Sequence, residues 1–109
     1  MIENYQIQNV VNKISNNFDP DKILIFGSFA TGNANQNSDL DLIIIKNSDL
    51  PRHKRSIEIQ KSLIGSMIPI DILVYTNQEF EEEKLQKNTF INLLNNSYKI
   101  VYERSNSFI

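Results

Sequence analysis

The sequence predicts an α/β fold of the α+β kind, in which a small mixed β-sheet is flanked by helices. Four short apolar segments have the length and β-branched content of strands, and the stretches between them carry apolar residues at helical spacing or residues that start helices. The length of 109 residues corresponds to one domain with one core, and no repeat or low-complexity linker divides it. We therefore expect a single domain over residues 1–109, with elements in the order α-β-β-α-β-α-α-β.

The first half of the chain is expected to form one helix, two strands and a polar turn. A helix over 2–17 is indicated by apolar side chains at helical spacing, which are Ile7, Val10, Val11, Ile14 and Phe18. An Asp-Pro-Asp sequence at 19–21 then ends this helix. Residues 23–26 predict a buried strand, residues 28–38 a small polar turn with room for one helical turn, and residues 40–45 a second strand.

The second half is expected to add two strands and three helices. Residues 47–51 combine N-cap candidates with a proline suited to a first helical turn, and the helix that follows is expected to run to about Gly65. Its inner face is assigned to Ile57, Leu63 and Ile64. A strand over 68–75 precedes a capping box, Thr76-Asn77-Gln78-Glu79, which opens a helix through 81–83. A helix over 87–96, with Phe90, Ile91 and Leu94 inward, and a strand over 98–103 follow.

Composition excludes several classes of function. The 11 Lys and Arg against 13 Asp and Glu give a net charge of −2, which argues against a protein that grips nucleic acid through a basic face. No apolar run is long enough to span a membrane, and the N-terminus lacks the blocks of a secretory signal, so we expect a cytoplasmic protein. Zero cysteines and one histidine exclude a thiolate site and make a His-based zinc site improbable. The chemistry must therefore rest on carboxylates, hydroxyls and backbone.

Two aspartates stand at the start of the second predicted strand. Because alternate residues of a strand point to the same side, Asp39 and Asp41 project together, while Leu40 and Leu42 face the core. Two adjacent carboxylates repel unless a cation sits between them. Mg²⁺ suits this place, since it prefers oxygen ligands and commonly binds one or two carboxylates together with substrate phosphates.

A third carboxylate and a glycine-serine turn fit the same site. Asp71 lies in the apolar strand 68–75, where a buried charge is costly unless it meets a metal or a partner. If the strands 40–45 and 68–75 are neighbours, the three carboxylates can converge on two metals about 3.5–4 Å apart. Gly27 lets the backbone approach a phosphate closely, amide groups at a following helix start favour anions, and the Ser28 hydroxyl can donate a hydrogen bond.

These residues resemble a known superfamily. Gly-Ser at 27–28, ten intervening residues, Asp-x-Asp at 39–41 and a later aspartate in an apolar strand resemble the nucleotidyltransferases that include DNA polymerase beta and the aminoglycoside nucleotidyltransferases. The short length and the order of elements resemble most the minimal nucleotidyltransferases of bacteria and archaea. The resemblance covers essentially the whole chain and implies the nucleotidyltransferase fold.

The resemblance implies a role for each of these residues. Gly27 and Ser28 would hold the triphosphate of ATP, and Asp39 and Asp41 would ligate two Mg²⁺ ions. Asp71 would bind the catalytic metal and help activate the attacking hydroxyl. Many relatives carry an arginine where this chain has Thr31, so one candidate phosphate-binding cation is missing.

The resemblance also implies a reaction and a partner. AMP would pass from ATP to a hydroxyl with release of pyrophosphate. Minimal nucleotidyltransferases are typically antitoxins of small all-helical toxins of the higher-eukaryote-and-prokaryote nucleotide-binding type, and the acceptor is a tyrosine of the toxin. Larger relatives add domains that bind the acceptor, so here we expect the acceptor surface to come from a second copy or a second protein, in a homo- or hetero-oligomer.

Other interpretations stay open beside this one. The chain could be a non-catalytic module that neutralises its partner by occlusion, or the subunit of an antibiotic-modifying nucleotidyltransferase. At the level of residues, Asp39 could cap a turn, Asp41 could pair with a lysine, and His53 could belong to a solvated basic helix start.

Overall fold

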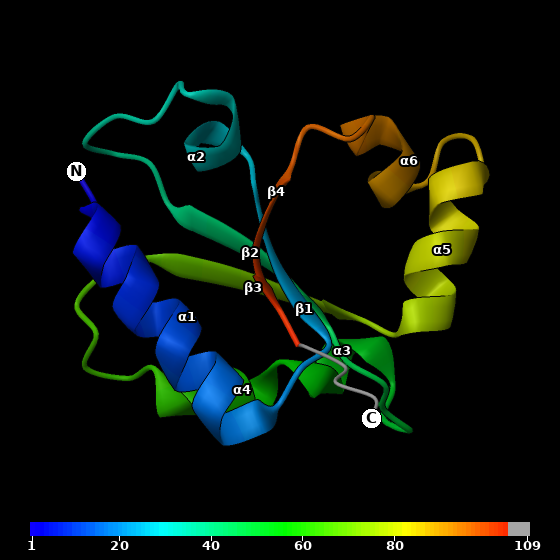
Figure 1. Cartoon of the computed structure of the whole chain (residues 1–109), viewed down its shortest axis with the longest axis horizontal. Helices are drawn as coiled ribbons and strands as arrows, with labels where there is room; N and C mark the ends of the chain where they lie inside the picture. Colours follow the sequence, from blue (N-terminus) through cyan, green and yellow to red (C-terminus); the bar gives the residue numbers. More distant parts are fainter. Residues whose placement is uncertain (105–109) are drawn as a thin grey trace, which may run out of the picture.

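A four-stranded mixed sheet with helices on both faces forms the fold (Figure 1). The computed structural model describes residues 1–104, so the last five residues of the expected 1–109 domain lie outside the described residues. The elements, in chain order, are α1 (Asn4–Phe18), β1 (Lys22–Phe26), α2 (Ser28–Thr31), β2 (Leu40–Ile45), α3 (Arg52–Arg55), α4 (Ile57–Ser62), β3 (Ile70–Tyr75), α5 (Asn77–Leu85), α6 (Phe90–Leu94) and β4 (Lys99–Glu103). The predicted fold class is confirmed.

The sheet has the order β3-β2-β1-β4. Strand β1 is central and runs antiparallel to both β2 and β4, whereas β2 and β3 are parallel. A parallel pair needs a crossover connection, and here the crossover carries α3 and α4. Strands β2 and β3 are therefore direct neighbours, which is the arrangement that the predicted convergence of the carboxylates requires.

Each face of the sheet carries its own apolar cluster. The alternation of side chains sends Leu40, Leu42 and Ile44 of β2 to the face covered by α1 and α4. The neighbours Ile43 and Ile45 point to the opposite face, where α5 and α6 pack (Figure 1). All five of these side chains are buried. Strand β2 thus belongs to both clusters, and its apolar run is the sequence signature of a strand covered on both faces.

Several local predictions are confirmed. Val10, Val11 and Ile14 are the buried residues of α1. The polar turn contains one helical turn, α2. Thr76 caps α5 as predicted, since its side chain accepts a hydrogen bond from the Glu79 backbone and the Glu79 side chain accepts one from the Thr76 backbone.

The helix expected to run to Gly65 is wrong in its continuity and in part of its inner face. It is divided at Ser56 into α3 and α4. Ile59 and Leu63, four residues apart, face the core, whereas Ile57 and Ile64 are 45% and 80% exposed. The apolar residues of this segment define two competing helical faces, and only packing against the sheet selects one of them.

The last helix is also shorter than the predicted 87–96. Ile91 is its buried anchor and Leu94 is half-buried, as expected, but Phe90 is 40% exposed. No helix within residues 1–104 has the length and apolar character needed to cross a bilayer.

Candidate functional site

Two of the three predicted carboxylates stand side by side at one end of the parallel strand pair. Asp41 of β2 is in register with Asp71 of β3. Both alternate with core-facing residues, so their side chains lie on the sheet face opposite Leu40 and Leu42. Asp39 precedes β2 by one residue and is exposed. The structure therefore brings Asp41 and Asp71 together and places Asp39 at the mouth of the same strand.

No basic side chain of the described residues compensates the charges of this group. Burial, followed by the charges of Asp71 and Asp39 and a side-chain hydrogen bond with Asp71, raises the pKa of Asp41 above its ordinary value. No lysine or arginine of residues 1–104 forms an ion pair with any of the three aspartates. The possibility that Asp41 pairs with a lysine is thus not realised. A group of oxygen ligands with unbalanced negative charge fits a hard divalent cation such as Mg²⁺.

One premise about Asp71 is wrong. Its position within an apolar strand suggested a buried charge, yet the residue is exposed. Strand β3 is an edge strand, and α5 and α6 cover its face only beyond the first residues. In addition, the described residues contain no group of three or more carboxylate or imidazole side chains close enough to hold one ion together. That Asp39 joins Asp41 and Asp71 on the metals stays a prediction.

Gly27 is required next to Asp41 for a reason that the sequence did not show. Its φ of 73° and ψ of −152° lie in a region that is essentially restricted to glycine. A Cβ at this position would overlap Oδ2 of Asp41 and lie 3.3 Å from its Cγ. Gly27 therefore leaves the space that the Asp41 carboxylate occupies.

The turn that follows Gly27 presents Ser28 and Thr31. Gly27 O accepts hydrogen bonds from the backbone of Ala30 and Thr31, which closes the single turn of α2. The Ser28 hydroxyl bonds to no other described residue, so it is available to a ligand. Thr31 is exposed at the end of the turn, and residues 28–38 contain no lysine or arginine.

An aromatic pair that was not predicted to belong to the site borders the carboxylates. Phe26, the last residue of β1, is in register with Asp41, so Phe26, Asp41 and Asp71 form one row across three strands. The Phe26 ring meets the Phe90 ring edge to face, with centroids 5.4 Å apart and planes at 79°. Only the strand register reveals this row, because Phe26 and Asp71 are far apart in sequence.

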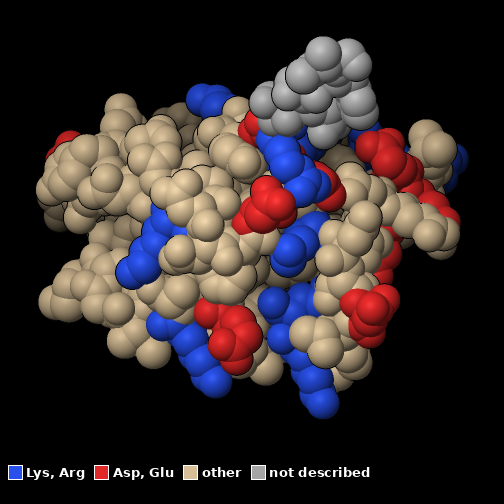
Figure 2. Space-filling model, turned by 60° about the horizontal axis from the view of Figure 1, so that its bottom comes forward, with Lys and Arg blue, Asp and Glu red and all other residues tan. Residues whose placement is uncertain are grey.

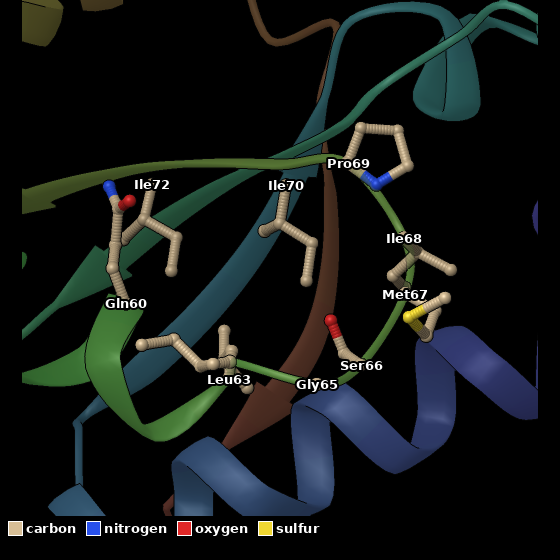
Figure 3. A pocket seen from close by; sticks show the side chains of 10 residues that line it. Gln60, Leu63, Gly65, Ser66, Met67, Ile68, Pro69, Ile70 and Ile72 are labelled. Carbon is tan, nitrogen blue, oxygen red and sulfur yellow. The ribbon is translucent and has the colours of Figure 1, made fainter.

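A large apolar cavity lies apart from this site. It has a volume of about 510 Å³ and lies between α4, the segment 63–69 and the edge strand β3 (Figure 3). Apolar side chains such as Leu63, Ile70 and Ile72 dominate its lining, and none of its lining residues is titratable. Its lining offers no side chain for acid or base catalysis, so the end of the sheet that carries Asp41 and Asp71 is the better candidate.

The charge pattern gives no support for a nucleic-acid interface on the face shown in Figure 2. Lysine and arginine side chains alternate there with aspartate and glutamate across the underside of the view in Figure 1. Binding to a phosphate backbone usually needs a patch of one sign. This face is mixed in charge, in line with the small net charge.

The fold and the site together define a class of protein. It is a small mixed-sheet domain in which neighbouring carboxylates and a glycine-serine turn meet at one end of the sheet. Carboxylates so placed suit divalent cations and phosphate esters.

Comparison with known proteins identifies the family. The model of the family described as "Polymerase beta, Nucleotidyltransferase" matches residues 8–107. Among solved structures, the chain is similar to a protein from Sulfolobus solfataricus provisionally described as a nucleotidyltransferase, with a TM-score of 0.66, 17% identity, and coverage of 96% of this chain and 84% of that chain. No curated protein matches. The chain belongs to the polymerase beta nucleotidyltransferase family, whose members transfer nucleotidyl groups.

Proposed function

We propose that the chain is a magnesium-dependent enzyme that transfers AMP from ATP to a hydroxyl of a partner protein. The observation that carries this proposal is the pairing of Asp41 with Asp71 in register on neighbouring strands, without a basic partner, directly beside the Gly27-Ser28 turn. Family membership supports nucleotidyl transfer. Family membership does not specify the nucleotide, the metal or the acceptor, and our proposal supplies these three.

We assign the site residues separate roles in phosphate binding, metal binding and proton transfer. Gly27 and Ser28 bind the triphosphate, while Asp39 and Asp41 hold the metal ions and Asp71 holds the catalytic one. Asp71 also accepts the proton of the acceptor hydroxyl as its oxygen bonds to the α-phosphorus of ATP, the bond to the β-phosphate oxygen breaks, and pyrophosphate leaves. Magnesium held by these carboxylates supplies neutralisation of phosphate charge and alignment of the reacting oxygens.

We further propose that the acceptor is a tyrosine of a small helical toxin and that the chain acts as its antitoxin in the cytoplasm. Two features support an external acceptor. The three predicted carboxylates lie at an open part of the sheet, since Asp39 and Asp71 are exposed. Within residues 1–104, every helix and strand belongs to the sheet and the layers that cover it, so none forms a separate acceptor-binding unit.

The test is a transfer assay with purified chain, Mg²⁺, ATP labelled at the α-phosphate, and the helical protein that co-purifies from the native cell. We expect label on the partner, in AMP-sized mass additions on tyrosine, and none with Asp71→Asn. Equal labelling by wild type and Asp71→Asn, or no labelling by either, would show the proposal to be wrong.

A second candidate is a non-catalytic module that blocks its partner by occlusion. The observation that favours it is the absence of any basic side chain in residues 28–38, where Thr31 replaces the arginine of many relatives. A titration separates the two functions. If Mg²⁺-ATP neither binds nor shifts the melting temperature while the partner still binds, the occlusion function is correct.

A further inference from the structure

We propose, on the basis of the nucleotidyl transfer proposed above, that Phe90 is the stacking platform for the nucleobase of the substrate. It is a base-binding residue of the same site and takes the planar aromatic base of a nucleoside triphosphate. No predicted site residue supplies such a contact, since Gly27, Ser28 and the three aspartates address only phosphates and metals.

The position of Phe90 follows from the sheet register. Phe26 stands beside Asp41 in the row that continues to Asp71. Phe90 reaches this row from α6 and packs its ring against Phe26. Phe90 thus contacts the residue that is paired with Asp41, so its ring lies next to the row that carries both carboxylates.

The backbone that carries Phe90 is firmly held. Thr89 caps α6 by accepting a hydrogen bond from the Asn92 backbone, and its hydroxyl donates to Glu83 O of α5 at 2.7 Å. The next residue, Ile91, is buried in the cluster on this face of the sheet. These contacts hold α6 in place without Phe90. The Phe90 ring is therefore available to contact a ligand.

The ring itself is oriented and accessible. An edge-to-face contact uses at most one face of each ring, so at least one face of Phe90 is not occupied by Phe26. Phe90 is 40% exposed, whereas Tyr75 and Phe80, which belong to the apolar cluster on this face of the sheet, are buried. An exposed aromatic face next to a phosphate-binding site suits a base, because every base offers a π-face for stacking.

The test compares two ligands that share the triphosphate and differ in the base. Binding of ATP and of inorganic tripolyphosphate is measured by calorimetry with Mg²⁺ for wild type, Phe90→Ala and Phe90→Tyr. We expect Phe90→Ala to weaken ATP binding about tenfold, or about 1.4 kcal/mol, and to leave tripolyphosphate binding unchanged. Phe90→Tyr keeps the aromatic face and should keep the affinity for ATP.

Two further variants are controls for loss of folding and for general effects of surface substitutions. Phe90→Leu retains apolar packing on Phe26 without a stacking face and should show the same selective loss. Leu85→Ala, at an 88% exposed position of α5, should change neither affinity. Thermal melting of each variant shows whether the fold is intact.

The possible failures are distinguishable. If wild type binds both ligands and Phe90→Ala and Phe90→Leu bind ATP as wild type does, or lose both ligands equally, Phe90 is not the base platform, while the proposed function stands. If wild type binds neither ligand, the proposed function itself is wrong, and so is the proposed role of Phe90.

Discussion

Gly27 shows how one missing side chain shapes the site. Its backbone conformation and the overlap that a Cβ would make with Asp41 Oδ2 are two independent reasons for glycine. We expect Gly27→Ala to lower the free energy of unfolding by about 2–4 kcal/mol, because it adds backbone strain and forces the Asp41 carboxylate to move. Denaturant unfolding measures the loss, and metal-dependent transfer should fall with it.

The matched control for this prediction is Gly32→Ala. Gly32 also has a positive φ, 82°, but its Cβ would meet nothing within 4 Å, so only about 1 kcal/mol of strain is expected. Repeating Gly27→Ala in an Asp41→Ala background removes the overlapping oxygen, so the cost should drop toward that of Gly32→Ala. An unchanged cost in that background would contradict the steric explanation.

We expect the Asp41 carboxylate to lower the stability of the metal-free protein, although the proposed metal binding requires it. A carboxyl whose pKa is raised in the folded chain binds its proton more tightly there than in the unfolded chain, so stability falls as the pH rises above the ordinary value of 3.8 and through the raised pKa. Asp41→Asn should therefore stabilise the metal-free protein at pH 7, and this gain should disappear near pH 3.

Thermal melts at the two pH values, with and without Mg²⁺, provide the measurement. Added Mg²⁺ should raise the melting temperature of wild type and leave that of Asp41→Asn nearly unchanged, because the variant has lost a ligand. A variant less stable than wild type at pH 7 would show that the carboxylates do not repel as inferred.

At the scale of elements, one arginine joins α3 to the sheet and to α5. The Arg55 side chain is only 9% exposed and holds Glu79 of α5 in two hydrogen bonds, of 2.6 and 3.1 Å. It also donates to the carbonyl oxygens of Leu50 and of Val74, an edge-strand residue of β3. Paired charges with further hydrogen bonds are the arrangement in which a nearly buried arginine is tolerated.

This ion pair predicts a defined pH dependence. The hydrogen bonds from Arg55 are the main cause that lowers the pKa of Glu79 from 4.5 to about 2. Its contribution to stability is therefore present above pH 4.5 and is lost as the pH falls to about 2. Glu79→Gln should cost about 2–3 kcal/mol at pH 7, and the difference from wild type should shrink over that window.

Glutamine at position 79 can still accept the hydrogen bond from the Thr76 backbone, so the capping box survives and only the charge is removed. Glu81→Gln is the control, because Glu81 pairs with Lys84 at 3.7 Å on the exposed side of α5 and should matter little at any pH. A cost of Glu79→Gln that does not vary between pH 5 and pH 2 would rule out the ion pair as its source.

The elements that could be predicted are those with strong local signals. Strand β2 was predicted with its observed bounds, and the Thr76 capping box was found from sequence alone. The buried face of the segment 52–64 could not be predicted, because Ile57, Ile59 and Ile64 allow two helical faces and tertiary packing decides between them. Local patterns specify an element, while its burial depends on what lies against it.

The same limit applies to the site. The sequence predicted one site for Gly27, Ser28, Asp39, Asp41 and Asp71. The structure brings Gly27, Asp41 and Asp71 together, whereas it places Asp39 one residue before β2. The neighbourhood of Phe26 and Phe90 was not predictable, since it arises from the antiparallel register of β1 with β2 and from the path of the chain after β3. The exposed position of Asp71 was missed because an edge strand cannot be recognised from its own residues.

At the scale of the whole molecule, the two apolar clusters share one sheet. The adjacent residues Ile43 and Ile44 of β2 are fully buried and point into opposite clusters. Ile14 of α1 lies in one cluster and Ile91 of α6 in the other. Because neither cluster can open without exposing the sheet that supports the other, we propose that the chain unfolds as one cooperative domain.

This proposal makes the final prediction. Ile14→Ala and Ile91→Ala, each at a buried position, should each cost about 2–5 kcal/mol and shift a single transition with an unchanged denaturant slope. Far-UV circular dichroism and tyrosine fluorescence should report the same midpoint for each variant. Native-state hydrogen exchange should show the amides of α1 and of α5 losing protection together in both. If Ile91→Ala released α5 and α6 alone while α1 kept its protection, the two faces of the sheet would be separate folding units. A partner bound over Asp41 and Asp71 could then order one face without the other.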